Sequence, residues 1–143
     1  MAGAAYDADF YSWSLEQAQL VRQGRWTELD RENVAEEIES LALAQFNKLE
    51  AALRILLIEM LKWDYAPGRR DRSVILEIGL QRIEIEELLS DNPGMRPRIT
   101  EAIERAYRRA RLGAAKETEL NEGVFPVNCG YDFDQIVTRD FAV

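Results

Sequence analysis

Three glutamates in the segment DRENVAEEIESLALA, residues 30–44, are spaced so that they could share one ligand. If this segment is helical, Glu32, Glu36 and Glu39 stand at i, i+4 and i+7 and form a row beside the apolar face. Carboxylate oxygens gathered in this way are the ligands that Mg²⁺ and Mn²⁺ prefer in proteins. The row is therefore a candidate site for a divalent cation, although the charged flank of an ordinary amphipathic helix has the same geometry.

Arginine side chains offer a second interpretation of the same row. Gln81 and Arg82 are predicted to face inward from a later helix, and an inward guanidinium group requires an anionic partner. Glu36 or Glu39 would provide that partner. The acidic row then belongs to a polar network that fixes how two helices pair, and we prefer this interpretation to the metal site.

The amino-acid composition narrows the chemistry further. The 143 residues include no histidine, which excludes Ser-His-Asp and Cys-His catalysis as well as every His-ligated metal site. The only cysteine, Cys129, cannot form an internal disulfide and is predicted to be a small buried side chain. Carboxylate chemistry is therefore the main catalytic option, and no catalytic nucleophile is visible.

Charge is unevenly distributed along the chain, whose net charge is −8. Lys and Arg number 6 against 12 Asp and Glu in residues 1–66, 11 against 8 in residues 67–116, and 1 against 6 in residues 117–143. An acidic protein repels nucleic acid, and a basic middle between acidic ends favours helix pairing within the fold. Four arginines of the middle could contact phosphates but are predicted to lie round their helix as a solvated face: Arg105, Arg108, Arg109 and Arg111.

Helical periodicity dominates the first half of the chain. Aromatic and apolar residues at spacings of three and four predict a helix over residues 7–23, ended by Gly24. A longer helix is predicted from residue 30 or 31 to residue 63, and its second half is apolar on nearly every side, which places it at the centre of the domain. Glu59 in that half is predicted to pair with Lys62. The inward stripe of this helix is predicted to comprise Ala35, Ile38, Ala42, Phe46, Leu49, Leu53, Leu56, Met60 and Trp63.

Two further helices and a tail complete the predicted fold. Residues 73–90 form one helix, and residues 97–119 form another whose inward positions are small enough to let two helices approach closely. The remaining tail carries too many apolar residues to be free and ends with a capped turn that begins at Asp132. The fold class is therefore all-α: one domain over residues 1–143, an antiparallel helical bundle of about four main helices with one long second helix and a C-terminal tail packed back on the bundle.

The location of the protein is predicted from its apolar segments. The start, MAGAAYDADFYSW, carries acidic residues where a targeting signal would carry basic ones. No segment approaches the roughly 20 apolar residues that cross a bilayer. We therefore expect a soluble, cytoplasmic protein with no membrane partner.

Several segments occur in an order that resembles a known bacterial family. They are YDADFYSW, QAQLVRQGRWTELDRENVAEEIESL, LLIEMLKWDYAPGRRDRS, QRIEI, LLSDNPGMRP and VFPVNCGY, which together span almost the whole chain. The pattern resembles the domain of unknown function 29 family, and the resemblance implies an α-helical protein without an established activity. It also implies recurrent polar positions at Asp30, Asn33, Glu36, Glu37, Glu39, Arg69, Arg72, Gln81 and Arg82.

The chain departs from this family pattern in three places. Glu59 stands where the family commonly has a histidine, Val74 where it has a tryptophan, and Gly130 where it has the proline of Cys-Pro-Tyr. A family role that depended on the histidine would therefore be changed or lost in this chain.

Together these features predict a binding or protein-interaction module without catalytic activity or cofactor, which associates with itself or with another protein. The alternative is a divalent-metal-dependent hydrolase that acts on a phosphorylated small molecule. In that hydrolase Mg²⁺ or Mn²⁺ is held by Glu32, Glu36 and Glu39, and the phosphate by Arg69, Arg72 or Arg82. RNA binding through the basic middle is a third, less favoured prediction.

Overall fold

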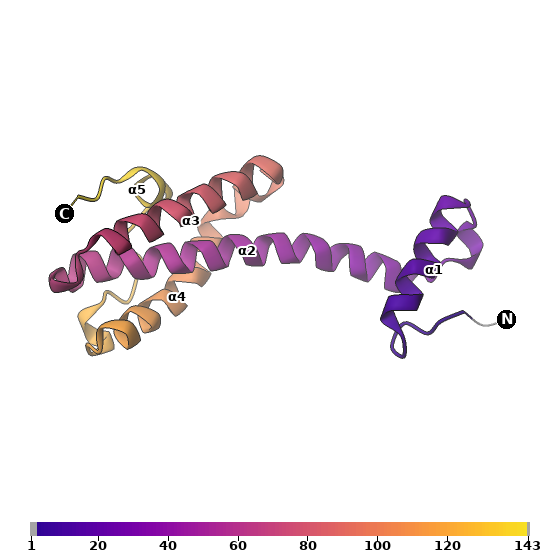
Figure 1. Cartoon of the computed structure of the whole chain (residues 1–143), viewed down its shortest axis with the longest axis horizontal. Coiled ribbons are helices and arrows are strands. Elements are labelled where there is room, and N and C mark those ends of the chain that lie inside the picture. The colour runs from indigo at the N-terminus through magenta and orange to yellow at the C-terminus, as the bar shows by residue number, and fades with distance from the viewer. Residues whose placement is uncertain (1–2, 143) are drawn as a thin grey trace. The chain divides into compact units, whose positions relative to one another are not determined.

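The structure is a computed structural model that describes residues 3–142, and it is built from helices alone over that range (Figure 1). The α-helices are α1 (Phe10–Arg22), α2 (Arg31–Tyr65), α3 (Arg72–Asp91), α4 (Ile99–Thr118) and α5 (Phe133–Thr138). Short 3₁₀ helices lie between them: η1 (Trp26–Glu28), η2 (Pro67–Arg69), η3 (Pro93–Arg98) and η4 (Glu122–Val124). The predicted all-α fold class is confirmed.

The chain divides into two compact units, with the boundary between Ala44 and Gln45 inside α2. The first unit contains α1, η1 and the beginning of α2, and the second contains the rest of α2 with α3, α4 and α5. The prediction of one domain over the whole chain stays a prediction.

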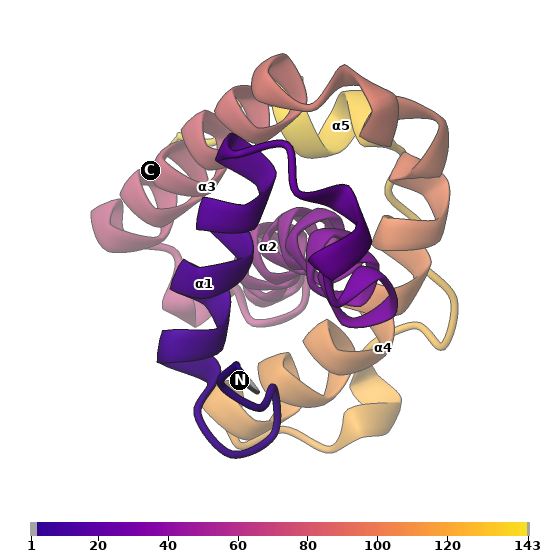
Figure 2. The ribbon, with the colours of Figure 1, turned by 90° about the vertical axis from the view of Figure 1, so that its right-hand side faces the viewer.

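In the first unit, α1 starts and stops at residues with clear capping roles. The side chain of Asp9 accepts a hydrogen bond from the backbone N–H of Ser12 at 3.0 Å, which fixes the first turn and explains why the helix begins three residues after the predicted Asp7. The chain leaves α1 at Gly24, whose φ of 68° is the left-handed conformation that glycine tolerates, and returns through η1 to the start of α2 (Figure 2).

Asp30 joins the two helices of the first unit. Its backbone N–H donates to Oε1 of Gln17 at 2.8 Å. Its carboxylate accepts from Nε1 of the buried Trp13 at 2.9 Å and from Nδ2 of Asn33 at 2.8 Å. These bonds satisfy polar groups that the packing of α1 removes from water, so Asp30 holds the turn between α1 and α2 in place.

Asp30→Ala is expected to loosen the first unit without unfolding the second. The substitution removes two side-chain hydrogen bonds and leaves the indole N–H of Trp13 buried without its partner, a loss on the order of 2 kcal/mol. Hydrogen exchange followed by mass spectrometry should show faster exchange in residues 10–33 and unchanged exchange in α3 and α4. Asp7→Ala, at an exposed position, is the control, and equal exchange in the two variants would contradict this role of Asp30.

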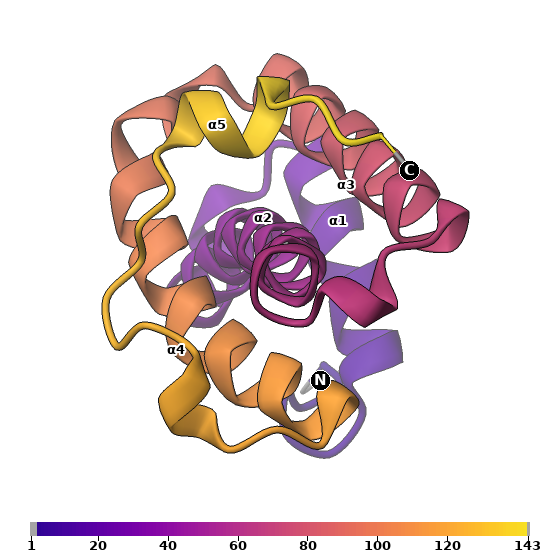
Figure 3. The same ribbon diagram turned by 90° about the vertical axis from the view of Figure 1, so that its left-hand side faces the viewer.

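In the second unit, α2 occupies the centre and the other helices surround it, as the end-on view in Figure 3 shows. Leu49, Leu53, Leu56 and Met60 of α2 are completely buried, which confirms that this half of the helix has neighbours on every side. α4 approaches closely at Gly113, where an added Cβ would lie 2.7 Å from Cδ1 of Ile58. The small residues of α4 therefore permit the tight packing that the sequence predicted.

The tail after α4 packs back on the second unit, as predicted. Phe125 and Ile136 are buried in the core. The hydroxyl of Tyr107 donates to the carbonyl of Pro126 at 2.5 Å, which joins α4 to the tail. α5 begins with a capping box, in which Asp132 is the N-cap. Cys129 is half-buried, and burial raises the pKa of its thiol above the ordinary value.

The predicted inward stripe of α2 is wrong at its beginning. Ala35, Ile38 and Ala42 are exposed, and Ile38 retains 61% of its accessible surface. Within the first unit, α1 packs on the other side of the helix, where Asn33 and Glu37 are half-buried. Polar contacts, chiefly those of Asp30, select that side, and apolar periodicity does not report them.

Candidate functional site

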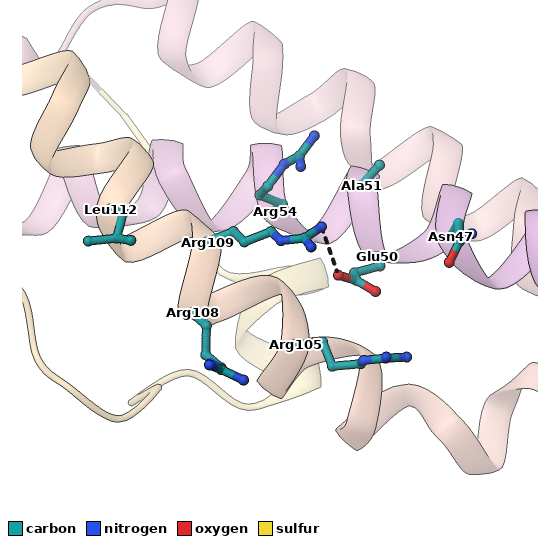
Figure 4. A pocket seen from close by; sticks show the side chains of 8 residues that line it. All are labelled: Asn47, Glu50, Ala51, Arg54, Arg105, Arg108, Arg109 and Leu112. Carbon is teal, nitrogen blue, oxygen red and sulfur yellow. Dashed lines mark ion pairs between the residues drawn. The ribbon is translucent and has the colours of Figure 1, made fainter.

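A groove lined by arginines from two helices is the most distinctive surface of the second unit. α4 contributes three arginines and a leucine at i, i+3, i+4 and i+7, so they share one face. α2 contributes the facing side, and the open space between them is about 740 Å³. Its lining is Asn47, Glu50, Ala51, Arg54, Arg105, Arg108, Arg109 and Leu112 (Figure 4).

The electrostatics of this arginine groove favour a bound anion. Four arginines line the groove together with a single carboxylate, that of Glu50, whose side chain is 15% exposed and lies 3.8 Å from Nη1 of Arg109. Arg105 is 3.9 Å from Glu101 on its own helix. Within residues 3–142, Arg54 and Arg108 form no ion pair. Positive charge therefore exceeds negative charge in the groove, and two guanidinium groups are free to bind a ligand.

Arg105, Arg108 and Arg109 of α4 are exposed to solvent, as predicted, but they share one face and are not spread round the helix. Arg105, Arg108 and Arg109 line the groove together, whereas Arg111 turns away and donates from Nε to the carbonyl of Phe125 at 3.0 Å. The spacing of the first three was a usable signal for a shared face. Their convergence with Arg54 depends on how α2 and α4 pack, which periodicity does not report.

The acidic row of α2 lies in the first unit and points to solvent. Glu32, Glu36 and Glu39 are all exposed, and the nearest cation to Glu32 is Arg31 at 3.6 Å. The neighbouring Glu37 is half-buried and accepts a hydrogen bond from the hydroxyl of Tyr6, which raises the pKa of Tyr6 to about 12. In the described part of the chain, no three Asp, Glu or Cys side chains are grouped closely enough to hold a metal ion. The metal-binding role of this row stays a prediction.

Comparison with known proteins places the chain in a family. A family model described as "Domain of unknown function DUF29" matches residues 5–142. The chain belongs to the DUF29 family. This confirms the resemblance inferred from the sequence motifs and assigns no activity. No curated protein and no solved structure matches the chain. Among the helices of residues 3–142, none combines the length and the apolar character that crossing a membrane requires.

The polar residues of the second unit that the sequence analysis singled out bind mainly within that unit. Arg82 donates from Nε to the carbonyl of Ile136 at 2.9 Å and from Nη2 to the carbonyl of Arg139 at 2.7 Å. Two main-chain carbonyls therefore take the place of the carboxylate that was predicted for Arg82, and burial lowers the pKa of its guanidinium group. Because both acceptors lie at the end of the chain, Arg82 fastens α5 and the following residues to α3.

The other polar residues singled out in this unit make fewer contacts. Gln81 donates from Nε2 to Oε1 of Glu77 on the same helix at 3.0 Å. Arg69 donates to the carbonyl of Thr118 at 3.4 Å, near the end of α4. Arg72 is the first residue of α3 and is exposed. The phosphate-clamping role predicted for Arg69, Arg72 and Arg82 stays a prediction.

Glu59 forms the ion pair that the sequence predicted. Its carboxylate oxygens accept from Nζ of Lys62 at 3.2 and 3.3 Å, which confirms the pairing. The residue is 8% exposed, and burial raises the pKa of its carboxyl group although Lys62 opposes the shift. Lys62 also lies 3.8 Å from Glu117 of α4. The position therefore carries a nearly buried ion pair.

A second polar cluster, which the sequence did not indicate, lies at the end of α2. Asp64 accepts two hydrogen bonds from Arg139, at 2.8 and 2.7 Å, and one from the hydroxyl of Tyr131 at 2.6 Å. The bonds from Arg139, and then that from Tyr131, hold the pKa of Asp64 below its ordinary value although burial opposes them. Asp64 takes up two N–H groups of Arg139 and the hydroxyl of Tyr131, so this cluster fastens the tail to α2.

Proposed function

We propose that this DUF29 protein is a non-catalytic binding module that holds an acidic segment of another protein in the arginine groove. The observation that supports this proposal is a groove lined by four arginines and only one carboxylate, that of Glu50. A guanidinium group presents its N–H donors in a planar fork that matches a carboxylate, so arginine is suited to bind acidic side chains in pairs of hydrogen bonds.

The rest of the lining favours a protein segment over nucleic acid. Leu112, which is 54% exposed, and Ala51 place apolar surface beside the arginines, and an acidic peptide that also carries an apolar side chain would cover both. No aromatic side chain of the described residues lines the groove, so bases would have nothing to stack on. The net charge of −8 also opposes binding of a long nucleic acid.

The direct test is a titration of a labelled peptide of alternating Glu and Leu residues into the full chain. Removal of the two unpaired guanidinium groups in Arg54→Gln/Arg108→Gln is expected to weaken binding by at least about tenfold, because each charge-assisted hydrogen bond contributes roughly 1.5–3 kcal/mol. Arg96→Gln is the control, since Arg96 is exposed and does not line this groove. Circular dichroism of each variant establishes that the fold is retained.

Substitution of Glu50 is expected to change the affinity for the peptide in the opposite direction. Its carboxylate competes with a bound anion for Arg109, so Glu50→Gln is expected to tighten binding of the same peptide several-fold. Added salt should weaken the wild-type complex, because exposed charges are screened over about 10 Å at 0.1 M ionic strength.

Two results would contradict the proposed function. One is an unchanged affinity of the double arginine variant for the Glu-Leu peptide, and the other is no binding of this peptide to the wild type at low salt. A mixed-sequence RNA of similar charge is titrated in parallel. If the RNA binds more tightly than the peptide and loses affinity in the double variant, the groove is a nucleic-acid site instead.

A further inference from the structure

α3 carries a second apolar stripe on the side that faces away from the core. Its inward residues include Val74, Ile78 and Ile85, which are buried. Its outer side carries Leu76, Leu80 and Ile83, which are 54%, 60% and 55% exposed. α3 lies along the outside of the second unit in Figure 3. Single exposed apolar residues are ordinary, but three of them at helical spacing form a stripe of the kind that a partner helix covers.

Gly79 lies within this outer stripe, in the middle of α3. Glycine weakens a helix interior relative to alanine, so its presence requires a reason. Apart from its chain neighbours and the backbone of its own helix, an added Cβ at Gly79 would have no atom within 4 Å, whereas the same atom at Gly113 would meet Ile58. Packing within the described chain therefore does not require glycine at position 79. Close approach of a second helix would require it.

The charges on the outer side of α3 are opposite at its two ends. Arg72 begins the helix and is exposed. Near the other end, a hollow of about 550 Å³ is lined by Ile83, Glu86, Glu87, Ser90 and Asp91. The surface is therefore basic at its start, apolar in its middle and acidic at its end. Such a surface is complementary to itself when two copies run in opposite directions.

We propose that α3 pairs antiparallel with α3 of a second copy, across a two-fold axis that passes between Gly79 and Leu80. In this register Leu76 packs against Ile83 of the partner subunit, and Leu80 packs against Gly79 of the partner subunit. Arg72 reaches Glu87 of the partner subunit, beside the acidic hollow. The two-fold axis repeats each contact, which is the property of an isologous interface.

The expected dimer is weak and independent of the arginine groove. One helix pair buries an area at the low end of protein interfaces, below about 1,200 Å², so the dissociation constant is expected on the order of micromolar. The groove lies between α2 and α4, whereas this stripe lies on the outer side of α3. The dimer therefore goes beyond the proposed function, and either can fail without the other.

Sedimentation equilibrium of the full chain tests the dimer. At tens of micromolar the wild type is expected to show a species of twice 16.5 kDa. Leu80→Asp places a charge in the middle of the stripe and is expected to weaken association at least about tenfold. Leu15→Asp, at a leucine of similar exposure on α1, is the matched control and should associate like the wild type. A wild type that remains monomeric at these concentrations would overturn the proposal.

Charge reversal tests the register. Arg72→Glu and Glu87→Arg should each associate at least about fivefold more weakly, because each places like charges opposite one another twice. An equal mixture of the two variants should associate like the wild type, since both contacts of the mixed dimer then join opposite charges. A mixture that associates no better than its components overturns this register. Gly79→Leu gives a second test of the register, because a leucine at this position would hold the two helices apart. If this variant keeps its helix content by circular dichroism and still dimerises as tightly as the wild type, the register is overturned.

Discussion

Phe125→Ala is expected to lower the free energy of unfolding of the second unit by about 3–5 kcal/mol, the range for removal of a buried phenylalanine ring. Phe125 is 1% exposed and packs edge-to-face with Tyr65, their ring centroids 5.9 Å apart. Its carbonyl accepts the hydrogen bond from Arg111. The ring thus holds the tail against α2 and α4, and its removal leaves a cavity that the surrounding helices can close only in part. Because small domains are stable by roughly 5–15 kcal/mol, the loss is a large fraction of the total.

Urea unfolding followed by circular dichroism measures this effect, and hydrogen exchange locates it. Residues 120–142 should exchange faster in Phe125→Ala than in the wild type. Val127→Ala is the matched control in the same segment, since Val127 is 74% exposed, and it should change stability by no more than about 0.5 kcal/mol. A loss below about 1 kcal/mol in Phe125→Ala would show that the tail is not part of the core.

The helices of the second unit could be predicted because their apolar residues repeat with the helical period and their ends carry stop signals. α3 was predicted over residues 73–90 and runs from Arg72 to Asp91. The capping box at Asp132 was also readable, because capping depends on residues only a few positions apart. Ile38 shows what periodicity cannot predict, because it was expected to face inward and is exposed. Periodicity identifies the apolar face of a helix, but whether another element covers that face depends on tertiary packing.

Polar partners were harder to predict than helices, for a physical reason. Glu59 and Lys62 are three residues apart on one helix, so geometry alone brings them together. Arg82 binds main-chain carbonyls, which every residue carries and which leave no signature in the sequence. Asp64 and Arg139 lie on segments far apart in the chain, and the arginine groove likewise needs the packing of α4 against α2 to bring Arg54 beside the others.

Asp64→Asn is expected to destabilise the second unit by about 2 kcal/mol at neutral pH, because hydrogen bonds to a charged group contribute roughly 1.5–3 kcal/mol and this cluster is only partly shielded from water. Asparagine offers one neutral amide oxygen in place of two charged carboxylate oxygens, so the two N–H groups of Arg139 and the hydroxyl of Tyr131 cannot all keep an acceptor. Asp134→Asn, at an exposed position in α5, is the control and should cost no more than a few tenths of a kcal/mol.

The pH dependence of this loss distinguishes the charge of Asp64 from its shape. The folded state holds the pKa of Asp64 below the ordinary value of 3.8, so the carboxylate stabilises the fold above that pH, and the stabilisation is lost as pH falls through the lower folded pKa. The difference in unfolding free energy between the wild type and Asp64→Asn should therefore be constant near neutrality and shrink below about pH 4. Taking this difference cancels the other titrating groups, including Glu59, whose raised pKa acts in the opposite direction. A difference that stays constant down to pH 3 would mean that Asp64 acts through packing and not through the charge that binds Arg139.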